Sequence, residues 1–143
     1  MKIVLDTSVV LSALLSRRGA SNKLLVWLFR NQKKYNVVSN TLVVEYESVL
    51  TRPENLKQCD LRREDMLRFV DDLCLISHHQ EIHFLWRPFL GDRNDDMVLE
   101  TAVNAGAGAI ITFNPKDFKE VWEQFGIKIL TPGEYLMKTG VSK

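Results

Sequence analysis

Short apolar runs alternate with helical patterns along the whole chain of 143 residues, and this alternation constrains the fold more than any other feature. The short runs, rich in β-branched residues, predict strands at residues 2–5, 35–38, 109–113 and 127–130. Apolar residues at helical spacing predict helices at about 9–15, 22–29, 41–50, 62–75 and 95–104, with a short one after Pro132. Residues 52–60 are predicted to be a polar connection. Such alternation indicates an α/β domain with a mainly parallel sheet and right-handed crossovers.

The composition is that of one folded domain over residues 1–143. Lys and Arg number 19 against 18 Asp and Glu, a net charge of +1, and 45% of the residues are hydrophobic, which excludes disordered and fibrous proteins. Cys59 and Cys74 lack a CxxC spacing and are expected to be free thiols. Because there is also no apolar leader after Met1 and Lys2, the sequence predicts a cytoplasmic protein. The apolar runs are too short to span a bilayer, so no membrane partner is expected.

Acidic and amide side chains follow two of the predicted strands. Asp6 comes after the first strand, and Asn114 and Asp117 come after the strand at 109–113. In an open parallel sheet, ligands bind outside the carboxyl ends of the strands, so these side chains are candidates for a site.

Two further acids are placed by helical arithmetic at about 100° per residue. Glu45 lies at the edge of the apolar face of its helix, and Asp95 lies at the middle of the buried face of its own. A carboxylate directed at the core is costly unless it is paired or bound to a metal, and oxygen donors without Cys or His favour Mg²⁺ or Mn²⁺. Such an ion at a carboxylate cluster usually acts on phosphates.

Each of these residues also has a purely structural interpretation. Asp6 is a favoured residue for capping the helix that follows it, and Glu45 is a good helix former at a solvated margin. Asp95 and Asp96 both suit the first turn of a helix, where acids favour the dipole. Asn114 and Asp117 could simply shape the loop that follows the strand.

Basic residues are unevenly placed in the chain. Between Thr7 and Val44 there are six basic residues and no acidic ones: Arg17, Arg18, Lys23, Arg30, Lys33 and Lys34. The first three flank the loop after the first helix and are predicted to meet RNA phosphates, with a solvated face as the alternative. Trp27 and Trp86 could stack on bases, although helical spacing favours the core for Trp27.

The motifs together resemble those of PIN-domain ribonucleases. The resemblance rests on the sequences IVLDTSV at 3–9, Glu45 in a helix, residues 92–102, ITFN at 111–114 followed by Asp117-Phe118, and ILTP at 129–132, and it spans nearly the whole chain. It is greatest to the toxins of bacterial and archaeal toxin–antitoxin pairs, the VapC-like branch. The resemblance implies a three-layer α/β/α fold and a divalent-metal-dependent endoribonuclease.

By position, the resemblance implies roles for individual residues. Asp6, Glu45, Asp95 and Asp117 would be catalytic acids. The metal would be held by Asp6, Asp95 and Asn114, with Asp96 competing with Asp95 for the third acid. Asn114 stands where many members have a fourth acid, which leaves open whether one or two metals operate. Ser8 and Thr112 match positions that the family uses to hold the acids.

The resemblance also implies partners: an RNA substrate, a small antitoxin protein and a second copy in a homodimer. Some apolar residues could belong either to a protein interface or to the core: Leu24, Leu25, Leu28, Tyr46 and Val49. A non-catalytic PIN-fold module that binds RNA or protein is the alternative, since Asn114 replaces an acid. A phosphohydrolase or phospho-receiver fits poorly, and a nucleoside triphosphate enzyme is unlikely without G-x-x-x-x-G-K-[ST].

Overall fold

A computed structural model describes residues 1–31, 33–84, 90 and 92–140. The strands are β1 (Ile3–Leu5), β2 (Val37–Val38), β3 (His78–His79), β4 (Ala109–Ile111) and β5 (Lys128–Leu130). The helices are α1 (Thr7–Leu15), α2 (Ala20–Arg30), α3 (Asn40–Leu50), α4 (Pro53–Cys59), α5 (Arg63–Leu75), α6 (Arg93–Ala105), α7 (Val121–Phe125) and α8 (Pro132–Thr139). A short 3-10 helix, η1 (Pro115–Phe118), follows β4.

All strand pairs in the described sheets are parallel. β4 lies between β1 and β5, and β2 pairs with β3. A parallel bridge between Ile3 and Asn36 brings β2 alongside β1, so the strands follow the order β3, β2, β1, β4, β5. The carboxyl ends of β1 and β4 are therefore neighbours at one edge of the sheet.

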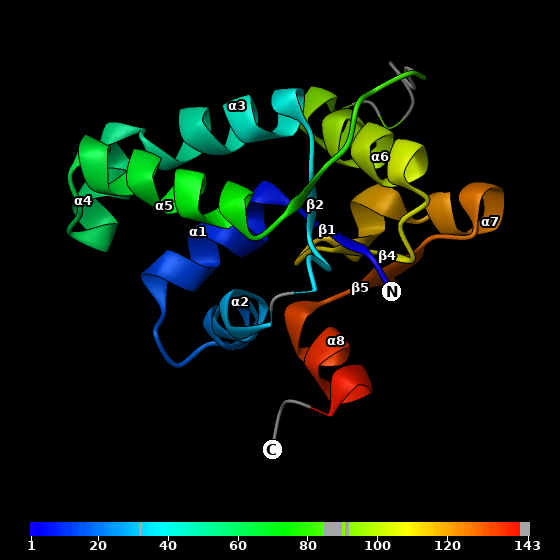
Figure 1. Ribbon diagram of the computed structural model, residues 1–143, viewed down its shortest axis with the longest axis horizontal. Helices are drawn as coiled ribbons and strands as arrows, with labels where there is room; N and C mark the ends of the chain where they lie inside the picture. Colours follow the sequence, from blue (N-terminus) through cyan, green and yellow to red (C-terminus); the bar gives the residue numbers. More distant parts are fainter. Residues whose placement is uncertain (32, 85–89, 91, 141–143) are drawn as a thin grey trace.

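Helices cover both faces of this sheet. α3 and α6 lie on one side of it, and α2 and α8 lie on the other (Figure 1). The strands β1 and β4 are fully buried between these layers because all of their residues are apolar. The predicted three-layer α/β/α fold with a parallel sheet is confirmed.

The structure contains four elements that the sequence pattern did not predict. The predicted polar connection at 52–60 contains α4, because Pro53 suits the first turn of a helix and Glu54 favours its dipole. The strand β3 lies where the sequence pattern gave no clear element. η1 and α7 were also missed, since helices this short carry little apolar periodicity.

Other findings concern the cysteines, the apolar residues of α2 and α3, and the lengths of the helices. Cys59 and Cys74 are free thiols. Leu24, Leu25, Leu28 and Tyr46 are buried in the core of one chain, so packing within the chain accounts for them. No helix in the described part of the chain is long and apolar enough to cross a membrane.

Candidate active site

The carboxylate of Asp6 is held by two hydroxyl groups. Asp6 follows β1 and is buried, and its Oδ2 accepts hydrogen bonds from Ser8 Oγ at 2.9 Å and from Thr112 Oγ1 at 2.8 Å. Asp6 occupies the N-cap position of α1, but its side chain makes no capping hydrogen bond. The interpretation of this carboxylate as a helix cap is therefore wrong, and Ser8 and Thr112 hold the acid instead.

The end of β4 supports this arrangement through the backbone. The backbone N–H of Asp6 donates to the carbonyl of Ile111 at 2.9 Å. The Thr112 hydroxyl, which donates to Asp6, accepts in turn from the backbone N–H of Asn114 at 3.0 Å. A continuous set of hydrogen bonds thus runs from the start of η1 to the carboxylate after β1, and the exposed Asn114 side chain lies at its outer end.

Carboxylates from separate elements act on Asp95 through their charges. This residue lies in the first turn of α6 and is half-buried. Burial, followed by the charges of Asp92, Asp6, Asp117 and Asp96, raises the pKa of Asp95 to about 7. The structure therefore brings the acids that follow β1 and β4 within electrostatic range of the acid at the start of α6.

Asp96 has a different position from its neighbour. Its side chain is buried, and its Oδ1 accepts a hydrogen bond from the backbone N–H of Leu90 at 2.8 Å. Asp95 was expected at the middle of the buried face of α6, but residues 96–102 are all buried while Asp95 is only half-buried. The reason is that α6 packs against β1, β2 and β4 and also against α3, so most of its circumference is covered.

Glu45 lies on α3, half-buried, as its position at the margin of the apolar face predicts. The next residue, Tyr46, is fully buried and donates a hydrogen bond from its hydroxyl to the carbonyl of Leu5, the residue before Asp6. Burial and the nearby charges of Asp6 and Cys74 raise the pKa of Tyr46. Within the described residues, Glu45 is not among the carboxylates that raise the pKa of Asp95.

The basic residues near the acids are not the ones that the sequence pattern favoured. Arg17 and Arg18 are exposed in the turn after α1, and Lys23 is exposed on α2. A helix of nine residues rises about 14 Å, so this turn lies well away from Asp6 at the other end of α1. The structure therefore does not bring these three cations to the acids.

Two other lysines stand beside Asp117. A hollow of about 290 Å³ is lined by Leu90, Lys116, Asp117, Lys119 and Glu120. Lys116 and Lys119 are exposed, and they flank Asp117 in the sequence. This spacing around a candidate acid is visible in the sequence, but it adds little to the charge asymmetry, which lies in the first third of the chain.

The structure describes one of the two tryptophans that could stack on bases, Trp27. Trp27 stacks on Tyr35 with ring centroids 5.4 Å apart and meets Tyr135 edge-on at 5.9 Å. It packs against the hydrophobic core, as its helical spacing predicts. Trp86 lies outside the described residues.

The donor set fits a hard divalent cation in its chemistry. Asp6, Asp95 and Asp117 offer carboxylate oxygens, and their mutual repulsion is of the kind that a cation relieves. In the part of the chain that the structure describes, no three Asp, Glu, His or Cys side chains converge closely enough to hold a metal ion.

A comparison with protein families shows which family this chain belongs to. The PIN domain family matches residues 2–116, well over half of the chain. The chain belongs to the PIN domain family. The match includes Asp6, Glu45, Asp95 and Asn114 and ends one residue before Asp117. No curated protein matches this PIN domain. PIN domains are commonly nucleases and generally use divalent metals.

Proposed function

We propose that this PIN domain is a divalent-metal-dependent endoribonuclease. The observation that carries the proposal is the group of carboxylates around Asp95, in which Asp6 is held by two hydroxyls rather than used to cap a helix. A buried acid oriented in this way at the carboxyl edge of a parallel sheet suits ligand binding better than it suits fold stability.

Asp6, Asp95 and Asp117 would hold Mg²⁺ or Mn²⁺, with Glu45 joining from α3 and Asn114 offering a neutral amide oxygen. When bound, such an ion activates water and neutralises charge on the phosphate that is attacked. We assign the position at the start of α6 to Asp95 rather than Asp96, because the Oδ1 of Asp96 already accepts the Leu90 N–H.

The other residues of the site act on these acids and on RNA. Ser8 and Thr112 fix the orientation of the Asp6 carboxylate through their hydrogen bonds to Oδ2. Lys116 and Lys119, on either side of Asp117, are positioned to attract the phosphates of RNA. The more distant Arg17, Arg18 and Lys23 remain predicted RNA contacts.

The resemblance to toxins supports a wider proposal. The protein would act in the cytoplasm as the toxin of a toxin–antitoxin pair, as a homodimer, with a small antitoxin protein as its inhibitor. Deleting a neighbouring antitoxin gene should then arrest growth only when Asp6 is intact.

A second candidate function is an RNA- or protein-binding module without catalysis. It is favoured by Asn114 at a position where many members have an acid, and by the lack of three converging metal-ligand side chains among the described residues. Binding of RNA without turnover in excess Mn²⁺ would support this candidate.

The test is cleavage of labelled single-stranded and structured RNAs by the wild type and Asp6→Asn, in Mg²⁺, Mn²⁺ or EDTA. Asp72→Asn is the matched control, because Asp72 is an exposed acid on α5. We expect metal-dependent cleavage that Asp6→Asn abolishes and Asp72→Asn retains. Cleavage at the wild-type rate by Asp6→Asn would refute the site, and binding without cleavage in every metal would favour the second candidate.

A further inference from the structure

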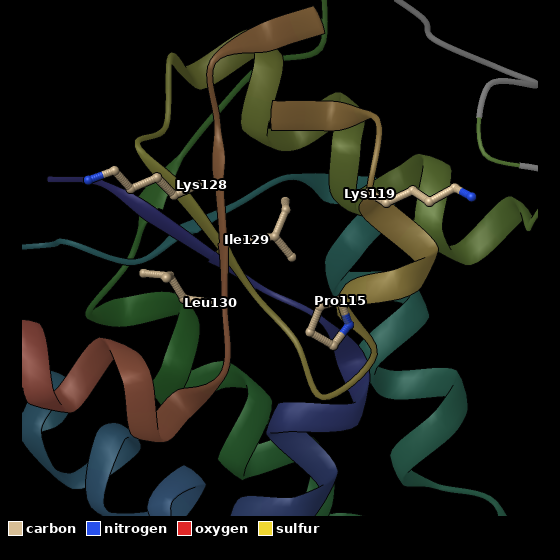
Figure 2. Close-up of a pocket in the computed structure, with 5 residues that line it drawn as sticks. All are labelled: Pro115, Lys119, Lys128, Ile129 and Leu130. Carbon is tan, nitrogen blue, oxygen red and sulfur yellow. The ribbon is translucent and has the colours of Figure 1, made fainter. Parts of the chain in front are cut away.

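Two hollows on the surface share one lysine. The hollow beside Asp117 is lined in part by Lys119, and Lys119 also lines a second hollow of about 360 Å³ with Pro115, Lys128, Ile129 and Leu130. Figure 2 shows Lys119 and Lys128 reaching outward on opposite sides of this second hollow, with Pro115 and Ile129 between them. The hollows thus extend from the acidic site onto β5.

The second hollow lies at the end of the sheet. β5 pairs with β4 on one side, and no further described strand pairs with its other side. It is lined by the apolar residues Pro115, Ile129 and Leu130 and by two lysines, Lys119 and Lys128. Such a surface can receive the sugars and bases of a nucleic acid strand while lysines meet the phosphates.

A further lysine continues the basic surface onto α8. α8 packs against β5, and the Lys128 side chain lowers the pKa of Lys138, so the two amino groups lie near each other. Among the described residues, no carboxylate forms an ion pair with Lys116, Lys119, Lys128 or Lys138. Glu134 attracts Lys138 through its charge, and neighbouring cations of this kind favour the binding of a polyanion.

We propose that single-stranded RNA leaves the acidic site along this lysine track, which we define as Lys116, Lys119, Lys128 and Lys138, with its bases over Pro115 and Ile129. This proposal rests on the proposed endoribonuclease function. It states where the RNA substrate lies beyond the bond that is cleaved. It replaces the turn after α1 as the main RNA-binding surface.

RNA suits the track better than a peptide strand added to the edge of β5. Main-chain pairing would explain an apolar edge, but it would not explain cations that begin beside the acids and continue onto α8. A phosphodiester chain must reach those acids to be cleaved, and its regularly spaced charges match a series of lysines.

The test measures RNA binding separately from cleavage. A fluorescently labelled single-stranded oligoribonucleotide is titrated with the wild type or Lys128→Gln/Lys138→Gln in EDTA, at several salt concentrations between about 50 and 200 mM. Lys57→Gln/Arg68→Gln is the matched control, because both residues are exposed cations on α4 and α5, helices whose main contacts are with α1 and α3. Both double variants remove two positive charges.

We expect the track variant to raise Kd at least threefold at the lowest salt and to flatten the slope of log Kd against log salt by about 1.4, or about 0.7 for each phosphate contact. The control variant should change neither value. Equal losses in both variants, or no loss in the track variant, would overturn the proposal. So would an acidic peptide whose binding depends on Lys128 and Lys138 while RNA binding does not.

Cleavage in Mn²⁺ separates this proposal from the one it rests on. A wild type that binds RNA through the track but cleaves in no metal would refute the endoribonuclease and leave the track standing. A wild type that cleaves, with a track variant that binds and cleaves equally well, would refute the track alone.

Discussion

The hydroxyl of Thr112 donates a hydrogen bond of 2.8 Å to Oδ2 of Asp6, although the two residues are 106 positions apart in the sequence. They meet because β1 and β4 are neighbours in the parallel sheet, so the residues that follow these strands lie side by side. Ser8 donates to the same oxygen from the first turn of α1. The carboxylate is therefore oriented by groups from both strand ends before any ligand arrives.

The first prediction concerns this orientation. Thr112→Val removes the hydroxyl while keeping the shape of the side chain, so Asp6 retains one of its two donors. Loss of a group that orients a metal ligand typically costs about 10- to 100-fold in activity or metal affinity. We expect a loss of that size in the rate of RNA cleavage and in Mn²⁺ affinity measured by titration.

Thr112→Ser is the matched control for this prediction, because it restores the donor without the methyl group. It should recover most of the wild-type rate and Mn²⁺ affinity. If Thr112→Val and Thr112→Ser lose activity equally, packing of the methyl group would matter rather than the hydrogen bond.

The second prediction concerns pH and the carboxylate of Asp95. Its pKa is about 7 in the folded protein, above the ordinary value of 3.8. Between these values the folded state binds more protons than the unfolded state, so this group makes the free energy of unfolding fall as pH rises from about 4 to about 7. In EDTA, Asp95→Asn should therefore be more stable than the wild type at pH 8 and equally stable at pH 4.

The expected gain at pH 8 is on the order of 1 kcal/mol, because solvent screens a half-exposed carboxylate and reduces the effect of the shift. Urea denaturation of both proteins across this pH range measures it. Asp72→Asn, which removes one exposed carboxylate from α5, is measured alongside as the control. A variant that is less stable than the wild type at pH 8 would mean that Asp95 is paired rather than repelled.

The sequence predicted the strands and acids of the site because both depend on local patterns. Asp6 directly follows a fully apolar strand, and the fold places every such strand end at one edge of the sheet. In the structure the charges of Asp6 and Asp117 act on Asp95, whereas no three of the described acids lie close enough together to hold a metal ion. Local patterns alone do not reveal which groups donate to Asp6, because Thr112 is brought next to Asp6 only by the order of the strands. The resemblance to PIN domains implied Ser8 and Thr112, and both donate to Asp6.

Helical arithmetic failed for α6 for a related reason. It assumes one buried face, whereas α6 is covered by the sheet and by α3 together, so Asp96 is more buried than Asp95. The lysines beside Asp117 do not stand out in a charge count, because acidic residues lie among them, whereas the first third of the chain has cations alone between Thr7 and Val44. A cation can act together with the acids only if it lies near them. For Arg17 and Arg18, the distance from Asp6 is set by the length of α1.

The third prediction concerns Tyr46, which ties α3 to the end of β1. Its buried hydroxyl donates to the Leu5 carbonyl, so Tyr46→Phe leaves that acceptor with one partner fewer. We expect a loss of about 1 kcal/mol in the free energy of unfolding, measured by urea denaturation. Tyr35→Phe is the control, since Tyr35 is only half-buried, and it should cost less. Equal costs would show that the hydrogen bond to Leu5 contributes little.

The fourth prediction separates the two adjacent acids of α6. Asp96 accepts the Leu90 N–H and is buried, so Asp96→Ala should lower the free energy of unfolding by about 1–3 kcal/mol through the lost hydrogen bond. Asp95→Ala removes a carboxylate that its neighbours repel, and it should leave the metal-free protein at least as stable at pH 8. Mn²⁺ should raise the melting temperature of Asp96→Ala but not that of Asp95→Ala, because we assign the metal to Asp95. The reverse pattern in the Mn²⁺ response would move the metal ligand from Asp95 to Asp96.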